Sequence, residues 1–276
     1  MLDLVRKIIK KEKVRYGKPK PILVSLLHCL YEAQDPSLCH FVAEQLECRL
    51  DLRCTSLTPV DCLAIGYFIS CVTVSIMSNS VNKFVVSLRN CSLGDTGTKS
   101  LMQSVCSSVD GHSTVNTNLI INIIANEIHE EGTSHIAEVL NRTNIVSTLW
   151  LDQNPIGDKG LLTIFDALKR NNTLKRLDVV SCEMTDTGVA SLADVLSTNN
   201  TLETLYIYGN DTLTGNGLTS LVEVLTRNSG LVKLVLPRHL EPCVDEVKRI
   251  INEARKRSGL AAIEVWGKYV LLKCMN

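Results

Sequence analysis

The stretch Gly94–Ser100 (GDTGTKS) comes near to a phosphate-binding loop, the turn whose backbone amides and lysine hold nucleotide phosphates. That motif needs a glycine directly before the lysine, whereas Thr98 separates Gly97 from Lys99. We therefore predict no nucleotide site here, and no other stretch suggests a cofactor.

Six histidines and eleven cysteines could in principle hold a metal or form a catalytic pair. The histidines show no HExxH spacing, the cysteines form no CxxC pair, and no nucleophile motif accompanies them. We therefore predict no metal site, no catalytic residues and no enzymatic activity. The N-terminus has basic residues but lacks the apolar run of an export signal. Free, largely buried thiols in a cytoplasmic protein are the expectation.

A third group of residues has the side-chain types that dominate the centres of protein interfaces, namely tryptophan, tyrosine and arginine. We predict that this group, with neighbouring charged residues, binds a protein partner. Its members are Trp150, Asp152, Arg176, Asp178, Tyr206, Tyr208 and Lys233. The alternative is that the rings only cover strand backbone or pack on a terminal cap.

These residues belong to a repeat that is clearest in Leu149–Gly160 (LWLDQNPIGDKG), where Leu149 and Leu151 alternate with polar or aromatic residues. The first strand residue of each predicted copy is Leu50, Val86, Ile121, Leu149, Leu177, Leu205, Leu234 or Ile263. The successive intervals are 36, 35, 28, 28, 28, 29 and 29 residues. A period of this length is the signature of a stacked solenoid, in which each repeat contacts only its neighbours.

Each copy predicts a short strand, a tight turn and a helix. The turn buries backbone groups, and Asn154 has the donors and acceptors that could satisfy them. The predicted structural ladder at this position is Cys91, Asn126, Asn154, Cys182 and Asn210, with Thr55 and His239 as departures at the ends. A glycine opens each helix, and its small size should let the helix approach the strand. These glycines are Gly97, Gly132, Gly160, Gly188 and Gly217.

The overall expectation is an α/β leucine-rich-repeat solenoid. Helices are about 10 Å wide and strands lie about 4.8 Å apart, so the stack should curve into a horseshoe with the strands on its concave face. Residues between the inward-pointing strand residues, such as Trp150, should then face outward on that concave face.

Two parts of the chain are predicted from composition. Residues 1–45 should form a helical N-terminal cap, with helices near 2–15, 22–32 and 38–46. Residues 46–276 should form the solenoid, about seven repeats with a C-terminal cap. The extra length of the first two repeats should lie near Ser75–Asn82 and Ser107–Asn118, where loop-forming residues concentrate.

Charge and hydropathy restrict the partners. The formal net charge is zero, so no nucleic-acid partner is predicted, although the first twenty residues are basic. Cys62–Met77 is uncharged but shorter than the roughly 18–20 residues that a helix needs to cross a bilayer. No membrane span is predicted.

The repeat frame resembles the ribonuclease-inhibitor class of leucine-rich repeats. Ser25–Val42 (SLLHCLYEAQDPSLCHFV) and Leu50–Val72 (LDLRCTSLTPVDCLAIGYFISCV) together resemble the junction in NLR proteins, innate immune sensors with a NACHT module, where the second helical domain passes into the repeats. The phosphate loop and acidic Mg²⁺ motif of a NACHT module are missing. The chain is therefore expected to be a C-terminal fragment, a truncated gene product or a stand-alone repeat protein.

The resemblance implies a non-enzymatic repeat domain of innate immunity that senses a ligand or holds a NACHT module inactive. Two alternatives stay open at this point. One is a ribonuclease-inhibitor-like protein. The other is a GTPase-activating repeat protein resembling the Ran regulator, for which Arg53 and Arg89 would be the candidates to stabilise transition-state charge.

Overall fold

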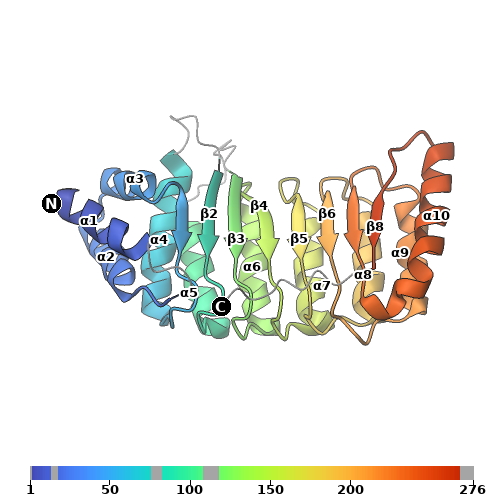
Figure 1. Cartoon of the computed structure of the whole chain (residues 1–276), viewed down its shortest axis with the longest axis horizontal. Coiled ribbons are helices and arrows are strands. Elements are labelled where there is room, and N and C mark those ends of the chain that lie inside the picture. Colours follow the sequence, from blue (N-terminus) through green and yellow to red (C-terminus); the bar gives the residue numbers. More distant parts are fainter. Residues whose placement is uncertain (1, 14–17, 76–82, 108–117, 268–276) are drawn as a thin grey trace.

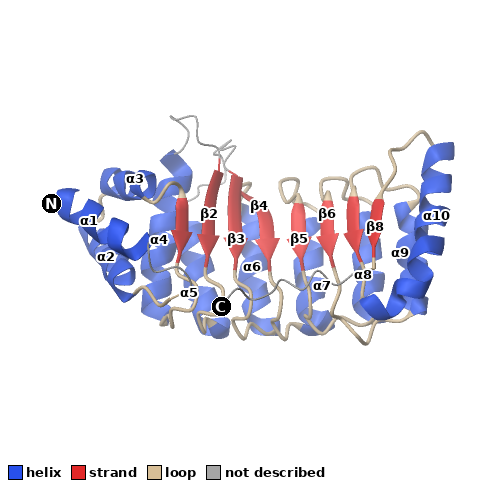
Figure 2. Ribbon diagram, viewed as in Figure 1, coloured by secondary structure: helices blue, strands red, loops and turns tan. Residues whose placement is uncertain are grey.

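The computed structural model describes residues 2–13, 18–75, 83–107 and 118–267. Strands and helices alternate along most of the chain, and the strands form one layer in front of a layer of helices (Figures 1 and 2). The strands are β1 (Arg49–Asp51), β2 (Lys83–Ser87), β3 (Asn118–Asn122), β4 (Val146–Trp150), β5 (Arg176–Asp178), β6 (Thr204–Tyr206), β7 (Lys233–Val235) and β8 (Glu264–Trp266).

Three helices precede the sheet at one end: α1 (Leu2–Lys13), α2 (Pro21–Ala33) and α3 (Pro36–Gln45). The helices between successive strands are α4 (Pro59–Ser75), α5 (Gly94–Ser107), α6 (Glu130–Arg142), α7 (Gly157–Leu168), α8 (Asp186–Leu196), α9 (Gly215–Leu225) and α10 (Glu241–Arg257). The predicted N-terminal helices are present with ends one or two residues away. For α3 the start is explained by Asp35, whose carboxylate accepts from the amides of Ser37 and Leu38.

The eight strands form one parallel sheet in chain order, β1 to β8. Their central apolar residues pair across the sheet, as Leu149 with Leu177 and Leu177 with Leu205. All three are at most 1% exposed, because the helices cover that face of the sheet. The predicted α/β leucine-rich-repeat solenoid is confirmed. Its other face we call the open face, since no helix in the described ranges lies over it (Figure 2).

The prediction for the last strand is wrong by two residues. Val265, and not Ile263, pairs with Leu234. The reason is that α10 has 17 residues and is followed by a turn through Gly259 at φ +70°, which lengthens the last repeat. Ile263 is instead held at the strand entry, where its amide donates to the Asn252 side chain at 2.8 Å. A shift of two residues keeps the side-chain alternation, so Trp266 still lies on the open face.

Other predictions about organisation have mixed outcomes. The two insertions fall mainly on residues 76–82 and 108–117, which lie outside the described residues. The division of the chain at residue 45 stays a prediction, although Val5 and Ile9 of α1 belong to the same apolar core as the repeats.

Most of the uncharged stretch that begins at Cys62 lies in α4, and Phe68 and Ile69 there are buried in the core. Within the described ranges, no helix has both the length and the apolar character that a bilayer crossing requires.

The turns after the strands are held by the buried asparagines. The Asn154 Oδ1 accepts from the backbone amides of Asn126 at 2.9 Å and Ile128 at 3.1 Å, one repeat earlier. Its Nδ2 donates to the carbonyls of Ile123 at 3.0 Å and Leu151 at 2.7 Å. Asn126 and Asn210 make equivalent bonds to their own preceding repeats. The side chain thus pairs groups that burial would otherwise leave unsatisfied.

Cysteines occupy the same position in two repeats. The thiol of Cys182 donates to the Leu151 carbonyl at 3.3 Å, and that of Cys91 to the Leu52 carbonyl at 3.1 Å. Burial raises the pKa of both thiols, that of Cys91 to about 12, so both stay protonated donors near neutral pH. His239, at the last position, lies 2.6 Å from the Leu213 carbonyl through its Nε2.

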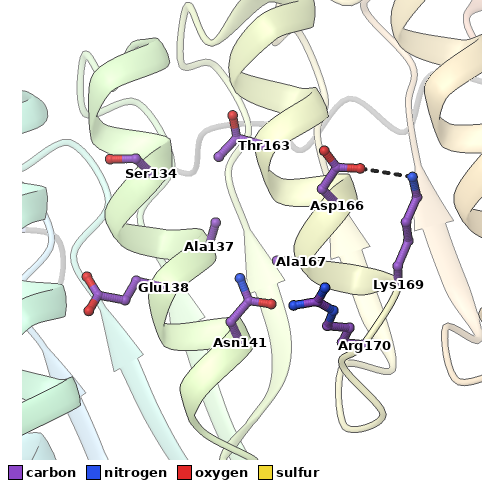
Figure 3. A pocket seen from close by; sticks show the side chains of 9 residues that line it. All are labelled: Ser134, Ala137, Glu138, Asn141, Thr163, Asp166, Ala167, Lys169 and Arg170. Carbon is purple, nitrogen blue, oxygen red and sulfur yellow. Dashed lines mark ion pairs between the residues drawn. The ribbon is translucent and has the colours of Figure 1, made fainter.

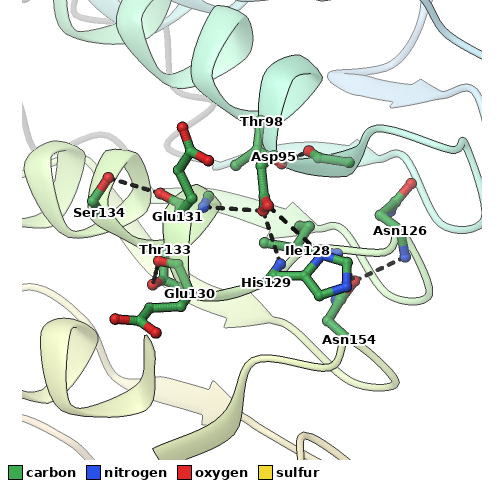
Figure 4. Close-up of polar contacts among 12 residues, drawn as sticks. Asp95, Thr98, Asn126, Ile128, His129, Glu130, Glu131, Thr133, Ser134 and Asn154 are labelled. Carbon is green, nitrogen blue, oxygen red and sulfur yellow. Dashed lines mark hydrogen bonds and ion pairs between the residues drawn. The ribbon is translucent and has the colours of Figure 1, made fainter. Parts of the chain in front are cut away.

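Three of the helix-opening glycines, Gly132, Gly188 and Gly217, face a carboxylate of the preceding repeat, which the sequence did not predict. A Cβ at Gly132 would lie 2.5 Å from the Asp95 carboxylate, and one at Gly188 would lie 2.5 Å from that of Asp158. The absence of a side chain at these glycines therefore leaves room for a carboxylate of the preceding repeat. The predicted close approach of helix to strand stays a prediction. Asp95 accepts from the amides of His129 at 2.8 Å and Gly132 at 3.0 Å, which caps the start of α6 (Figure 4).

A second set of buried asparagines joins the helix ends. Asn199 donates to the carbonyls of Leu168 and Asn171, and Asn228 repeats this one repeat later. At the C-terminal end of the series, Arg255, which is only 1% exposed, makes the equivalent bonds to backbone carbonyls. Its Nη1 donates to Leu225 at 3.1 Å and to Asn228, and its Nε to Ala261 at 2.6 Å. A guanidinium thus completes the series where no further repeat follows in the described chain.

Candidate functional site

The open face carries the predicted binding residues in two adjacent rows. Trp150, Asp178 and Tyr206 pair in register across β4, β5 and β6. Arg176 and Lys233 lie two residues earlier on β5 and β7 and pair with the same residue of β6, Thr204. Strand alternation turns all of these side chains away from the helices. The sheet therefore places residues that are 28 residues or more apart in the chain on neighbouring strands.

Aromatic rings and cations alternate along this part of the face. The guanidinium carbon of Arg176 lies 5.3 Å from the ring centroid of Trp150 and 4.5 Å from that of Tyr206. The Nζ of Lys233 lies 5.4 Å from the Tyr206 centroid. We call Trp150, Arg176, Tyr206 and Lys233 the cation–aromatic row. Each such contact contributes about 0.5–1 kcal/mol at an exposed position, so the row holds its own side chains in place.

Asp178 fixes Arg176 from the side. Its carboxylate accepts from the Arg176 Nε at 2.9 Å and Nη2 at 2.7 Å, which is a bidentate ion pair. Asp178 is 5% exposed, and burial raises its pKa while the bonds from Arg176 oppose that rise. The Arg176 guanidinium thus contacts two aromatic rings, those of Trp150 and Tyr206, and one of its edges is bonded to the Asp178 carboxylate.

Asp152 lies beside this pair. Its Oδ1 accepts from the backbone amide of Val180 at 3.1 Å, which ties β4 to the next repeat. Burial, together with the nearby charge of Asp178, raises the pKa of Asp152 to about 7. This carboxyl therefore changes charge near neutral pH.

Tyr208 completes the set of predicted residues. Its ring lies 6.3 Å from that of Tyr206 at an interplanar angle of 69°, an edge-to-face contact. All seven predicted residues are therefore brought together over β4 to β7. Trp266 lies on the same face but beyond β7, is 49% exposed, and its Nε1 is 3.4 Å from the Glu264 carboxylate.

The arginines proposed for transition-state stabilisation lie elsewhere on the sheet. Arg53 donates from Nε and Nη2 to the Asp51 carboxylate at 2.9 and 2.8 Å. Lys20, buried beneath the first repeat, also lies 3.8 Å from that carboxylate. The Arg53 guanidinium thus forms a bidentate ion pair with Asp51 within the chain.

A pocket on the helix side of the sheet was not predicted from the sequence. It measures about 620 Å³ and opens between α6 and α7 (Figure 3). Its lining is Ser134, Ala137, Glu138, Asn141, Thr163, Asp166, Ala167, Lys169 and Arg170. The sequence feature that could have indicated this pocket is Ala167. Larger residues, Val139, Val195 and Val224, occupy the equivalent position in the neighbouring repeats. Asp166 and Lys169 at its rim pair with each other at 3.0 Å.

Among the described residues no three or more His, Cys, Asp or Glu side chains gather in a way that could hold a metal ion. The ten cysteines of the described ranges carry free thiols.

A comparison with family models identifies leucine-rich repeats in part of the chain. A family model described as leucine-rich repeat matches residues 170–193 and 198–222, two segments that contain β5 with most of α8 and β6 with most of α9. Among solved structures, leiomodin-1 actin-binding site 2 matches with 21% identity and a TM-score of 0.48, over 57% of this chain and 89% of that one. No curated protein matches the sequence. The repeats of this chain are leucine-rich repeats.

Proposed function

We propose that this chain is a non-enzymatic protein-interaction module that binds a protein partner through the cation–aromatic row. The observation behind the proposal is the row itself. It places an arginine in contact with both a tryptophan and a tyrosine on one half-exposed surface, and these are the three residue types richest in interface hot spots. Their side chains are already held by stacking and by Asp178, so binding would order few further rotamers.

The test is partner capture with variants that spare the buried ion pair. Trp150→Ala with Tyr206→Ala removes both rings and keeps Arg176 on Asp178. The matched control is Leu162→Ala, which trims a side chain of α7 that is 43% exposed on the opposite side. We expect the double variant to lose its partner by about tenfold or more while the control keeps it. Equal recovery of the same partner by wild type and double variant, with unchanged circular dichroism, would contradict the proposal.

The finer proposal concerns the origin of the module. The resemblance of Ser25–Val42 and Leu50–Val72 to the NLR junction supports a role as the repeat end of a cytoplasmic innate immune sensor. In such a protein the open face could also contact a NACHT module and restrain it. Sequencing the transcript upstream of Met1 tests this. An in-frame phosphate loop supports the sensor reading, whereas a stop codon shortly before Met1 argues for an independent repeat protein.

A further inference from the structure

Two cationic groups of the cation–aromatic row, the Nη1 of Arg176 and the Nζ of Lys233, are donors without a described acceptor, whereas the Tyr206 hydroxyl can both donate and accept. Asp178 uses the Nε and Nη2 of Arg176, and no described acceptor meets the Nη1. Lys233 lies over Tyr206 and forms no ion pair within the described chain. The Nε1 of Trp150 also lacks a hydrogen-bond partner among the described residues, but it is buried and therefore does not count among the donors that the surface offers. A surface with surplus donors is complementary to a partner that supplies acceptors.

The charges lead to the same chemistry. Arg176 and Lys233 are two cations, and the carboxyls near them are Asp178, already committed to Arg176, and Asp152. Glu264 pairs in register with Lys233 on β8, but the ion pairs of the described residues do not join the two, and the Glu264 carboxylate lies 3.4 Å from the Trp266 Nε1. Asp152 carries less than a full charge near neutral pH because its pKa is about 7. The two cations lie on β5 and β7, with β6 between them. At about 4.8 Å per strand they are roughly 10 Å apart, which one short peptide segment can span.

We propose that the partner binds this face with an acidic peptide segment, whose carboxylates meet Lys233 and the free edge of Arg176 across β5 to β7. This inference rests on the proposed function and specifies the partner. The rings of Trp150 and Tyr206 then flank the segment and exclude water, which strengthens the charged contacts. The carboxylates gain charge-assisted hydrogen bonds that water alone would otherwise supply.

The chain offers a built-in reporter, because it has only two tryptophans, Trp150 and Trp266. Trp266→Phe leaves Trp150 as the single tryptophan, so that tryptophan-selective fluorescence and the indole N–H signal in ¹H–¹⁵N spectra both report on it alone. Into this variant we would titrate acetylated hexaglutamate, with hexaglutamine and hexalysine peptides as controls. We expect a saturable change in the Trp150 signal with hexaglutamate alone, weakening as salt is raised from low to physiological concentration and beyond.

The matched pair of variants is Lys233→Glu on the row and Lys256→Glu on the exposed side of α10. Reversing the charge at Lys233 should weaken the affinity for hexaglutamate by about tenfold or more. Reversing the charge at Lys256 should change that affinity by no more than about twofold. Thermal melts of both variants show that neither is unfolded. The inference is wrong if hexaglutamine binds as well as hexaglutamate, if no titration changes the Trp150 signal, or if both reversals weaken binding equally.

Two further outcomes separate this inference from the proposed function. If a hexapeptide of phosphoserine binds and hexaglutamate does not, the face recognises phosphate and the carboxylate proposal is wrong. If hexaglutamate fails while Trp150→Ala with Tyr206→Ala still abolishes partner capture, open-face binding stands and only the acidic chemistry is wrong. If the double variant also keeps its partner, both proposals are wrong.

Discussion

The interior turns and the open face both use polar side chains at repeated positions, but in opposite ways. In the interior, Asn154 is 0% exposed and its amide makes bonds to backbone groups of two repeats. On the open face, Arg176 and Lys233 are only half-buried, and the Arg176 Nη1 and the Lys233 Nζ have no described acceptor. In the interior the hydrogen-bonding groups are satisfied within the chain, whereas on the open face some donors remain available to a partner.

This difference separates structural from functional polar residues. A buried polar group without a partner costs about 1–3 kcal/mol, so an interior position tolerates only side chains that satisfy the turn. A half-exposed donor can bond to water and costs little, so the open face is free to carry a chemical pattern chosen for another molecule. Substitutions at the two regions should therefore differ in kind: interior ones should change stability and open-face ones should change binding.

The largest effect is expected at the interior turn. Asn154→Leu would remove bonds to Asn126, Ile128, Ile123 and Leu151 together, leaving their backbone groups buried and unpaired. We expect a loss of about 3–5 kcal/mol in the free energy of unfolding, measured by urea denaturation. Asn154→Cys is the matched variant, because Cys182 already fills the equivalent position. It should cost about half as much, and equal costs for the two variants would contradict the hydrogen-bond explanation.

The contact between neighbouring repeats should give the next largest effect. Gly188→Ala would place a methyl group 2.5 Å from the Asp158 carboxylate, which must then move off the Thr185 amide that it caps at 2.8 Å. We expect a loss of about 2 kcal/mol. In the Asp158→Ala background the same substitution should cost clearly less, because the clash with the carboxylate is gone. Additive losses in this double-mutant cycle would show that the glycine serves some other purpose.

A smaller effect, at the border of the two regions, depends on pH. The folded state raises the pKa of Asp152 from 3.8 to about 7, so it holds this proton more tightly than the unfolded chain does. The contribution to stability is therefore full below about pH 4 and declines as pH rises toward 7. A rise of about three pKa units corresponds to at most about 4 kcal/mol. Because the Asp152 side chain is only partly buried and water screens part of this effect, we expect Asp152→Asn to gain about 1–2 kcal/mol over wild type at pH 8, relative to their difference at pH 4.

Urea denaturation between pH 4 and pH 8 measures this gain. Asp245→Asn, at an exposed position on α10, is the control and should leave the pH profile unchanged. Parallel profiles for wild type and Asp152→Asn would mean that the carboxyl is as well solvated in the folded state as in the unfolded chain.

The smallest change in stability is expected on the open face itself. Tyr206→Ala would remove the ring contacts to Arg176 and Lys233, which contribute about 0.5–1 kcal/mol each at most when exposed. We expect a loss of about 1 kcal/mol by calorimetry or denaturation, together with the loss of binding described above. A loss as large as that of Asn154→Leu would remove the distinction between the two regions and make the row a structural feature.

The sequence by itself determined the elements of the repeat and the direction of its side chains. The spacing of Leu149, Leu177 and Leu205 follows from the need of each strand to bury one face, so their register could be predicted without coordinates. The same alternation requires Trp150 to point outward. Such conclusions depend only on backbone geometry within one repeat, which a local pattern specifies.

Only the tertiary structure decided how the repeats meet. The pairing of Val265 with Leu234 depends on the length of α10, and the place of Asp158 beside Gly188 depends on how closely two repeats stack. The partners of Arg176 and the raised pKa of Asp152 likewise come from neighbouring strands. Distances between residues a full repeat apart are set by side-chain packing over the whole core. A periodic sequence therefore shows which residues share a face, but not which of them touch.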